Sequence, residues 1–121
     1  MKIKINTYHK KIFADTITPV EVYLKIRDIF PNSLLLENSD YMLANNNYSY
    51  ICFNQIASFE VFEDILSTKF PDKSNNEISC SKENLIIELQ NFINRFKVES
   101  SELPFISNGL FGYTSYDAVK Y

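Results

Sequence analysis

Glycine is scarce in this chain, which has only two glycines among its 121 residues, Gly109 and Gly112. The chain also has no tryptophan, one histidine and two cysteines, Cys52 and Cys80. So few cysteines exclude a disulfide scaffold, and with a single histidine they exclude a Cys/His zinc site built from this chain alone. A glycine-rich phosphate loop is excluded too, because the Gly-x-x-Gly at 109–112 opens no convincing helix.

An excess of positive charge and long apolar runs are lacking as well. The formal net charge is −3, which argues against a broad nucleic-acid-binding face. No apolar run approaches the roughly 20 residues of a membrane span. Residues 1–13 alternate charged and apolar side chains and lack the apolar centre of a signal peptide. We therefore expect a cytoplasmic protein with free thiols and with neither a membrane nor a nucleic acid as partner.

Apolar and aromatic residues are plentiful. Hydrophobic residues make up 45% of the chain, which has 10 phenylalanines and 8 tyrosines, so intrinsic disorder is excluded as the main state. The length corresponds to one domain or part of one.

Two helices are expected from capping signals and apolar periodicity. The first starts at Pro19, with Thr18 as N-cap and Glu21 closing a capping box, and continues to about Phe30. Its apolar face is wide enough to suggest cover on more than one side. The second covers 82–97 after the N-cap Ser81. Its apolar stripe, which we assign to core packing, comprises Leu85, Ile86, Leu89, Phe92, Ile93 and Phe96.

Strands are expected before, between and after these helices. The last of them, 105–116, contains both glycines, which we attribute to a positive φ or a close backbone approach; a bulged strand is the simpler alternative. The polar run 71–76 is the best candidate for a mobile loop. Because several strands follow one another without helices, the predicted class is α+β, a mostly antiparallel sheet with two main helices. The other expected strands are 2–6, 32–37, 48–53, 56–62 and 65–70.

Four segments in order resemble the N-terminal region of anthranilate synthase component I. DTITPVEVYLKIR at 15–27 is similar to the family's D-T-x-T-P-V-x-x-Y-x-x-L-R opening, and LLEN at 35–38 is similar to L-L-E-S. YSYI at 48–51 is similar to R-Y-S-[FY]-I. NGLFGYTSYD at 108–117 is similar to G-G-x-x-G-Y-x-x-Y-D and accounts for both glycines. The structural-motif residues that it supplies are Gly109, Gly112, Tyr113, Tyr116 and Asp117.

The resemblance implies a part in tryptophan biosynthesis. Enzymes of this family are lyases that convert chorismate and ammonia, with Mg²⁺, to anthranilate and pyruvate, and a glutamine amidotransferase subunit supplies the ammonia. The motifs of the chorismate-binding region are missing here. We therefore expect residues 1–121 to be the N-terminal regulatory domain, a truncated fragment of the larger chorismate-utilising enzyme fold. It should have no catalytic residues and no cofactor of its own.

The resemblance also implies one half of a feedback site for L-tryptophan. The family's L-L-E-S segment corresponds to Leu36, Glu37 and Asn38, and Ser39 could supply the missing hydroxyl. Asn47 replaces the basic residue before Y-S. A zwitterion needs an acceptor for its ammonium group, such as Glu37, and an apolar surface for its indole.

Two other interpretations stay open. Aminodeoxychorismate synthase component I shares the Gly-Tyr-x-x-Tyr-Asp pattern, although the Thr-Pro-Val opening favours anthranilate synthase. A freestanding binding module without a parent enzyme is the alternative from another class. If the chain is a fragment, it should also self-associate through an unpaired strand edge and the apolar face of the first helix.

Overall fold

The computed structural model describes residues 2–37, 48–99 and 103–121. The chain divides into two compact units, each assembled from segments that are far apart in sequence. Unit 1 comprises Met1–Thr7, Ile56–Glu102 and Tyr113–Tyr121, and unit 2 comprises Tyr8–Gln55 and Leu103–Gly112. In the described ranges, no helix is both long enough and apolar enough to span a bilayer.

Unit 2 begins with the predicted first helix, α1 (Pro19–Ile26). The Thr18 hydroxyl accepts the Glu21 N–H at 3.2 Å, which confirms the N-cap. The Glu21 carboxylate instead accepts from Lys25 Nζ at 2.7 Å, so the predicted capping box is only half formed. The helix also ends four residues earlier than predicted, at Ile26, as the chain approaches Pro31, whose ring disfavours helical geometry in the preceding residue.

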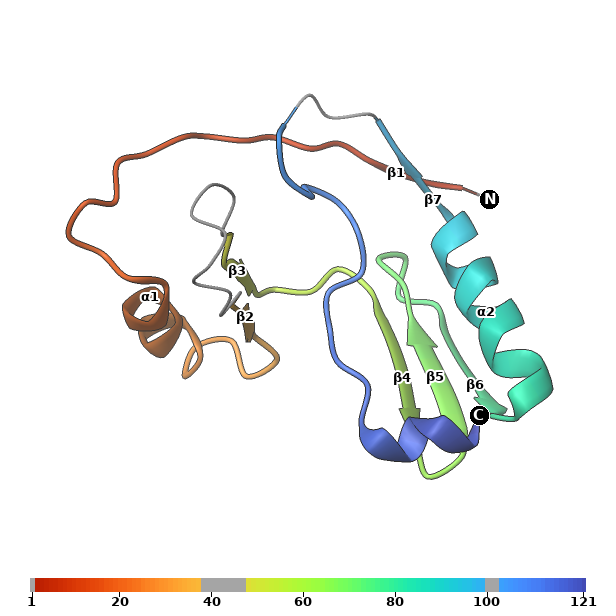
Figure 1. Cartoon of the computed structure of the whole chain (residues 1–121). Coiled ribbons are helices and arrows are strands. Elements are labelled where there is room, and N and C mark those ends of the chain that lie inside the picture. Colours follow the sequence, from red (N-terminus) through yellow and green to blue (C-terminus); the bar gives the residue numbers. More distant parts are fainter. Residues whose placement is uncertain (1, 38–47, 100–102) are drawn as a thin grey trace. The chain divides into compact units, whose positions relative to one another are not determined.

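Beside α1 lie two short antiparallel strands, β2 (Leu34–Leu36) and β3 (Tyr50–Cys52), both within predicted strands (Figure 1). Their register places Leu36 opposite Tyr50. The rings of Phe30 and Phe53 pack at 5.1 Å between centroids and join the two flanking segments. No α1 residue is buried in the described structure, so the expected cover on more than one side of this helix is not observed.

Unit 1 contains a three-stranded antiparallel sheet with the order β4 (Ser58–Phe62), β5 (Ile65–Lys69) and β6 (Asn75–Ser79). The run 71–76, predicted to be a mobile loop, forms a tight turn and the start of β6. Asp72 Oδ1 accepts from the Ser74 N–H at 2.9 Å, and the Phe70 N–H donates to the Ser74 carbonyl at 3.1 Å. Residues 71–74 therefore connect two strands, and only Asn75 and Asn76 of the predicted loop belong to β6, because polarity alone does not show where an edge strand begins.

The second helix, α2 (Lys82–Asn94), lies beside this sheet in Figure 1. Its capping box is present, since the Ser81 N–H donates to Asn84 Oδ1 at 2.7 Å. The helix ends at Asn94, and Phe96–Val98 forms a strand, β7, that pairs in parallel with β1 (Ile3–Ile5). Helical periodicity included Phe96 in the predicted helix, and no local pattern indicates this parallel pair.

The core of unit 1 is aromatic. Phe92 on α2 is only 2% exposed, and its ring packs against those of Phe59, Phe70 and Phe96 at 5.5, 5.1 and 5.4 Å. Ile86 and Ile93, which belong to the predicted core stripe, are 63% and 48% exposed. The buried face of α2 is therefore narrower than its apolar pattern.

The predicted final strand, 105–116, is not formed. This segment lacks regular structure until a 3₁₀ helix, η1 (Tyr116–Lys120). Neither glycine has a positive φ; a Cβ at Gly109 would meet only Ile106 at 3.7 Å, and one at Gly112 would meet nothing within 4 Å. Both reasons given for the glycines are therefore contradicted. The left-handed positions of the described chain are Asn54, Glu63, Asp64 and Lys73.

The predicted class is nevertheless confirmed. The described chain has two main helices and mostly antiparallel pairings, an α+β arrangement in which β1 and β7 are the parallel exception.

Candidate functional site

The candidate site lies at the end of β2 in unit 2. Leu36 is half-buried and faces Tyr50 across the β2–β3 pair, so their side chains share one side of the pair. The Tyr50 ring packs on Phe111 at 5.3 Å. We call Leu36, Tyr50 and Phe111 the apolar cluster. It contains one residue from each of the second, third and fourth sequence motifs.

A second aromatic contact holds the glycine-containing segment 103–112 against the residues around β3. Tyr48, two residues before Tyr50, packs on Phe105 at 5.6 Å. Two rings of the segment 103–112 therefore meet two rings at and before β3. The segment therefore contacts this part of unit 2 through aromatic side chains.

Glu37 follows β2 directly and is exposed. Glu37 is therefore a solvent-accessible carboxylate that is next in sequence to Leu36 of the apolar cluster. Asn38, Ser39 and Asn47, the other predicted tryptophan-site residues, lie outside the described residues.

The fourth motif is divided between the two units. Gly109 and Gly112 belong to unit 2, whereas Tyr113, Tyr116 and Asp117 belong to unit 1. The two tyrosine side chains are almost fully exposed. Within unit 1, the Asp64 carboxylate accepts hydrogen bonds from Lys120 Nζ at 2.6 Å and from the Tyr121 hydroxyl, and these bonds lower the pKa of Asp64. Sequence reasoning missed this cluster.

The two thiols are poor nucleophiles. Burial raises the pKa of Cys52 in β3, and burial together with the charge of Asp64 raises the pKa of Cys80. A raised pKa keeps each thiol protonated at neutral pH. Both cysteines therefore fit a packing role, and both are free thiols as the sequence predicts.

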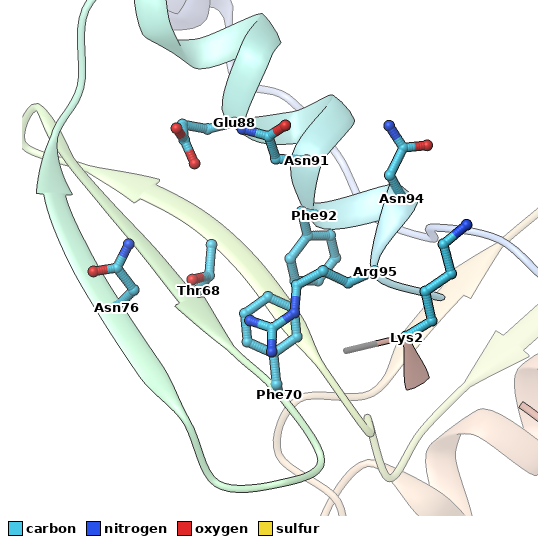
Figure 2. A pocket seen from close by; sticks show the side chains of 9 residues that line it. All are labelled: Lys2, Thr68, Phe70, Asn76, Glu88, Asn91, Phe92, Asn94 and Arg95. Carbon is cyan, nitrogen blue, oxygen red and sulfur yellow. The ribbon is translucent and has the colours of Figure 1, made fainter. Parts of the chain in front are cut away.

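Unit 1 has an open groove of about 430 Å³ beside α2. Figure 2 shows Asn76 and Thr68 on one side of it and α2 residues on the other, with the Arg95 guanidinium over the Phe70 ring. The guanidinium carbon is 3.8 Å from the ring centroid, and Arg95 Nη2 is 3.7 Å from Asp72 Oδ2. Arg95 therefore joins α2 to the β5–β6 turn. The groove is lined by Lys2, Thr68, Phe70, Asn76, Glu88, Asn91, Phe92, Asn94 and Arg95.

The residues present do not fit a divalent metal site. Residues 2–37, 48–99 and 103–121 contain no group of three or more His, Cys, Asp or Glu side chains that could hold a metal ion. Magnesium is bound chiefly through carboxylates and retained waters. We assign no step that uses Mg²⁺ to these residues.

The fold is that of an α+β chain in which an exposed carboxylate, Glu37, follows the apolar cluster residue Leu36 in sequence. No protein-family model matches the chain, and no solved structure matches it significantly. Two curated proteins do match. The chain is 32% identical over 110 residues to anthranilate synthase component 1 of Lactococcus lactis, and 30% identical over 109 residues to the protein of the same name from Pseudomonas aeruginosa.

Each match covers 89% of this chain and 22% of the relative, so the chain spans about a fifth of the length of the curated relatives it matches. The resemblance to the N-terminal region of anthranilate synthase component I, predicted from four short motifs, is confirmed.

Proposed function

We propose that this chain forms the N-terminal regulatory region of an anthranilate synthase component I and supplies one half of an L-tryptophan feedback site. The observation that carries the proposal is the apolar cluster. Three motifs that are separated in sequence each contribute one of its residues, Leu36, Tyr50 and Phe111. The cluster would contact the indole, and Glu37 would accept hydrogen bonds from the ammonium group.

The remaining functions follow from the same proposal. The chain serves as scaffold for a chorismate-binding region that completes the tryptophan pocket, carries out the lyase reaction and holds Mg²⁺. A glutamine amidotransferase subunit supplies ammonia, and the assembly works in the cytoplasm. Residues 1–121 form one regulatory domain of that enzyme and are not catalytic alone.

A chimera tests the proposal. Residues 1–121 replace the segment of the Lactococcus lactis enzyme that they match, and anthranilate formation from chorismate and ammonia is followed by product fluorescence. We expect the chimera to make anthranilate and the chain alone to make none above background. Anthranilate that scales with the concentration of the isolated chain, or a folded chimera that makes no anthranilate, would contradict the assignment.

The same chimera tests Glu37. Glu37→Gln should raise the tryptophan concentration needed for half-inhibition about tenfold, since a charge-assisted hydrogen bond to the ammonium becomes a neutral one. The turnover number without tryptophan should not change. The matched control is Glu60→Gln, which removes an exposed carboxylate from β4 in unit 1. Equal effects of the two substitutions would exclude a direct role for Glu37.

We also propose that the isolated chain self-associates. Large apolar side chains remain exposed in both units, among them Phe13 in unit 2 and Phe62 in unit 1. Within the described residues, β4 is an edge strand, and unpaired edges and apolar patches favour association. Light scattering over a concentration series should show species heavier than the 14.1 kDa monomer. A monomer that persists at the highest concentration would refute this.

A further inference from the structure

The turn between β4 and β5 has an unusual composition for its geometry. Phe62 pairs with Ile65, so only Glu63 and Asp64 connect the two strands. Both have a positive φ, 48° and 63°. Hairpins of this kind strongly prefer Asn-Gly or Asp-Gly, because glycine adopts the left-handed region freely. The chain instead has an aspartate at the second position, where glycine is preferred.

Asp64 has contacts that a glycine could not make. Its carboxylate Oδ1 accepts from Lys120 Nζ at 2.6 Å and from the Tyr121 hydroxyl, which are 56 and 57 residues away in sequence. Its backbone carbonyl, which a glycine would also supply, accepts from the Cys80 N–H at 2.7 Å. Within the described chain, the side-chain hydrogen bonds that reach residues 116–121 from another element both end on Asp64.

These contacts are at one end of η1. A 3₁₀ helix has three residues per turn, so Tyr116 and Val119 lie on one side of it. Their side chains are 88% and 73% exposed. Lys120 and Tyr121, at the end of the helix, contact Asp64 instead.

We propose that Asp64 is a positioning residue that anchors residues 116–121 on the β4–β5 turn and so determines which side of η1 faces solvent. The anchor explains why the turn keeps a carboxylate where glycine would be less strained. It also explains how Tyr116 and Asp117 of the fourth motif are held in unit 1. The inference uses contacts within unit 1 alone and does not depend on the proposed function.

Substitutions at Asp64 that keep the left-handed turn test the anchor. Both Asp64→Gly and Asp64→Asn tolerate a positive φ, so the hairpin should fold in each. The readout is amide hydrogen exchange of Ala118 and Tyr121, whose N–H groups donate within this segment to Ser115 and Ala118 at 3.1 Å. We expect exchange of these two amides to accelerate about fivefold in both variants, because local opening of the segment becomes easier. Amides of the β4–β5 ladder should keep their protection.

Matched variants separate the anchor from a general effect of charge or turn strain. Glu63→Gln removes the neighbouring turn carboxylate and should leave exchange at Ala118 unchanged. Lys120→Met should accelerate exchange as the Asp64 variants do, whereas Lys120→Arg should retain most of the protection. The double variant Asp64→Asn, Lys120→Met should exchange about as fast as either single variant, because both substitutions remove the same contact. Unchanged exchange in Asp64→Gly and Asp64→Asn, or equal effects of Lys120→Arg and Lys120→Met, would overturn the proposal.

Discussion

Replacing Phe92 with alanine should reduce the free energy of unfolding by about 3–5 kcal/mol, the usual cost of deleting a buried phenyl ring. Phe92 is 2% exposed and is the ring against which Phe59, Phe70 and Phe96 all pack. The cavity would open where α2 meets the sheet, and the neighbouring rings, two of which pack edge-on to Phe92, cannot close it without losing their mutual geometry. Urea unfolding followed by far-ultraviolet circular dichroism gives the measurement.

Ile86 supplies the matched control, because it lies on the same helix but is 63% exposed. Ile86→Ala should change the free energy of unfolding by no more than about 0.5 kcal/mol. Since domains of this size have only about 5–15 kcal/mol of stability, Phe92→Leu is the milder variant if Phe92→Ala does not fold. Equal losses for Phe92→Ala and Ile86→Ala would show that the aromatic core is not the centre of unit 1.

L-Tryptophan should bind the isolated chain only in the millimolar range. The described half of the proposed site has a half-buried Leu36 and an exposed Glu37, so it removes little of an indole ring from water. Losing about 4 kcal/mol of contacts from the missing half would take a micromolar site to a millimolar one, a factor of about 1,000.

The composition of the chain makes this measurement direct. Because the chain contains no tryptophan, the fluorescence anisotropy of the ligand itself reports binding. Calorimetry provides an independent value, and Glu37→Gln tests whether any weak signal arises at the proposed site. A micromolar dissociation constant would mean that residues 1–121 hold a complete pocket.

Local signals predicted those elements whose ends are fixed by nearby residues. Thr18 and Ser81 start the two helices as predicted, because a side-chain cap acts within three residues of itself. Leu34–Leu36 and Tyr50–Cys52 were predicted as strands from short apolar runs. The family resemblance was also accessible from sequence, since it depends on motif order and needs no coordinates.

The errors occurred where contacts between distant segments decide the outcome. The segment 105–116 has strand-like apolar residues, but Phe105 and Phe111 pack on tyrosines at and before β3 without forming a backbone ladder. The polar run Asn75–Ser79 is the exception, since its partner β5 precedes it directly in sequence; it becomes a strand because β5 offers it a hydrogen-bonding edge. Phe96 leaves the helix because the β1–β7 pairing takes over at that residue.

The sequence by itself determined the α+β class, the starts of both helices and the resemblance to anthranilate synthase component I, because capping, periodicity and motif order are encoded by residues close together in the chain. Only the tertiary structure decided which residues meet. It placed Leu36, Tyr50 and Phe111 in one cluster and Asp64 beside Lys120 and Tyr121. These contacts join residues 14 to 61 positions apart, and such a partner is selected by the packing of the whole unit, which no local pattern specifies.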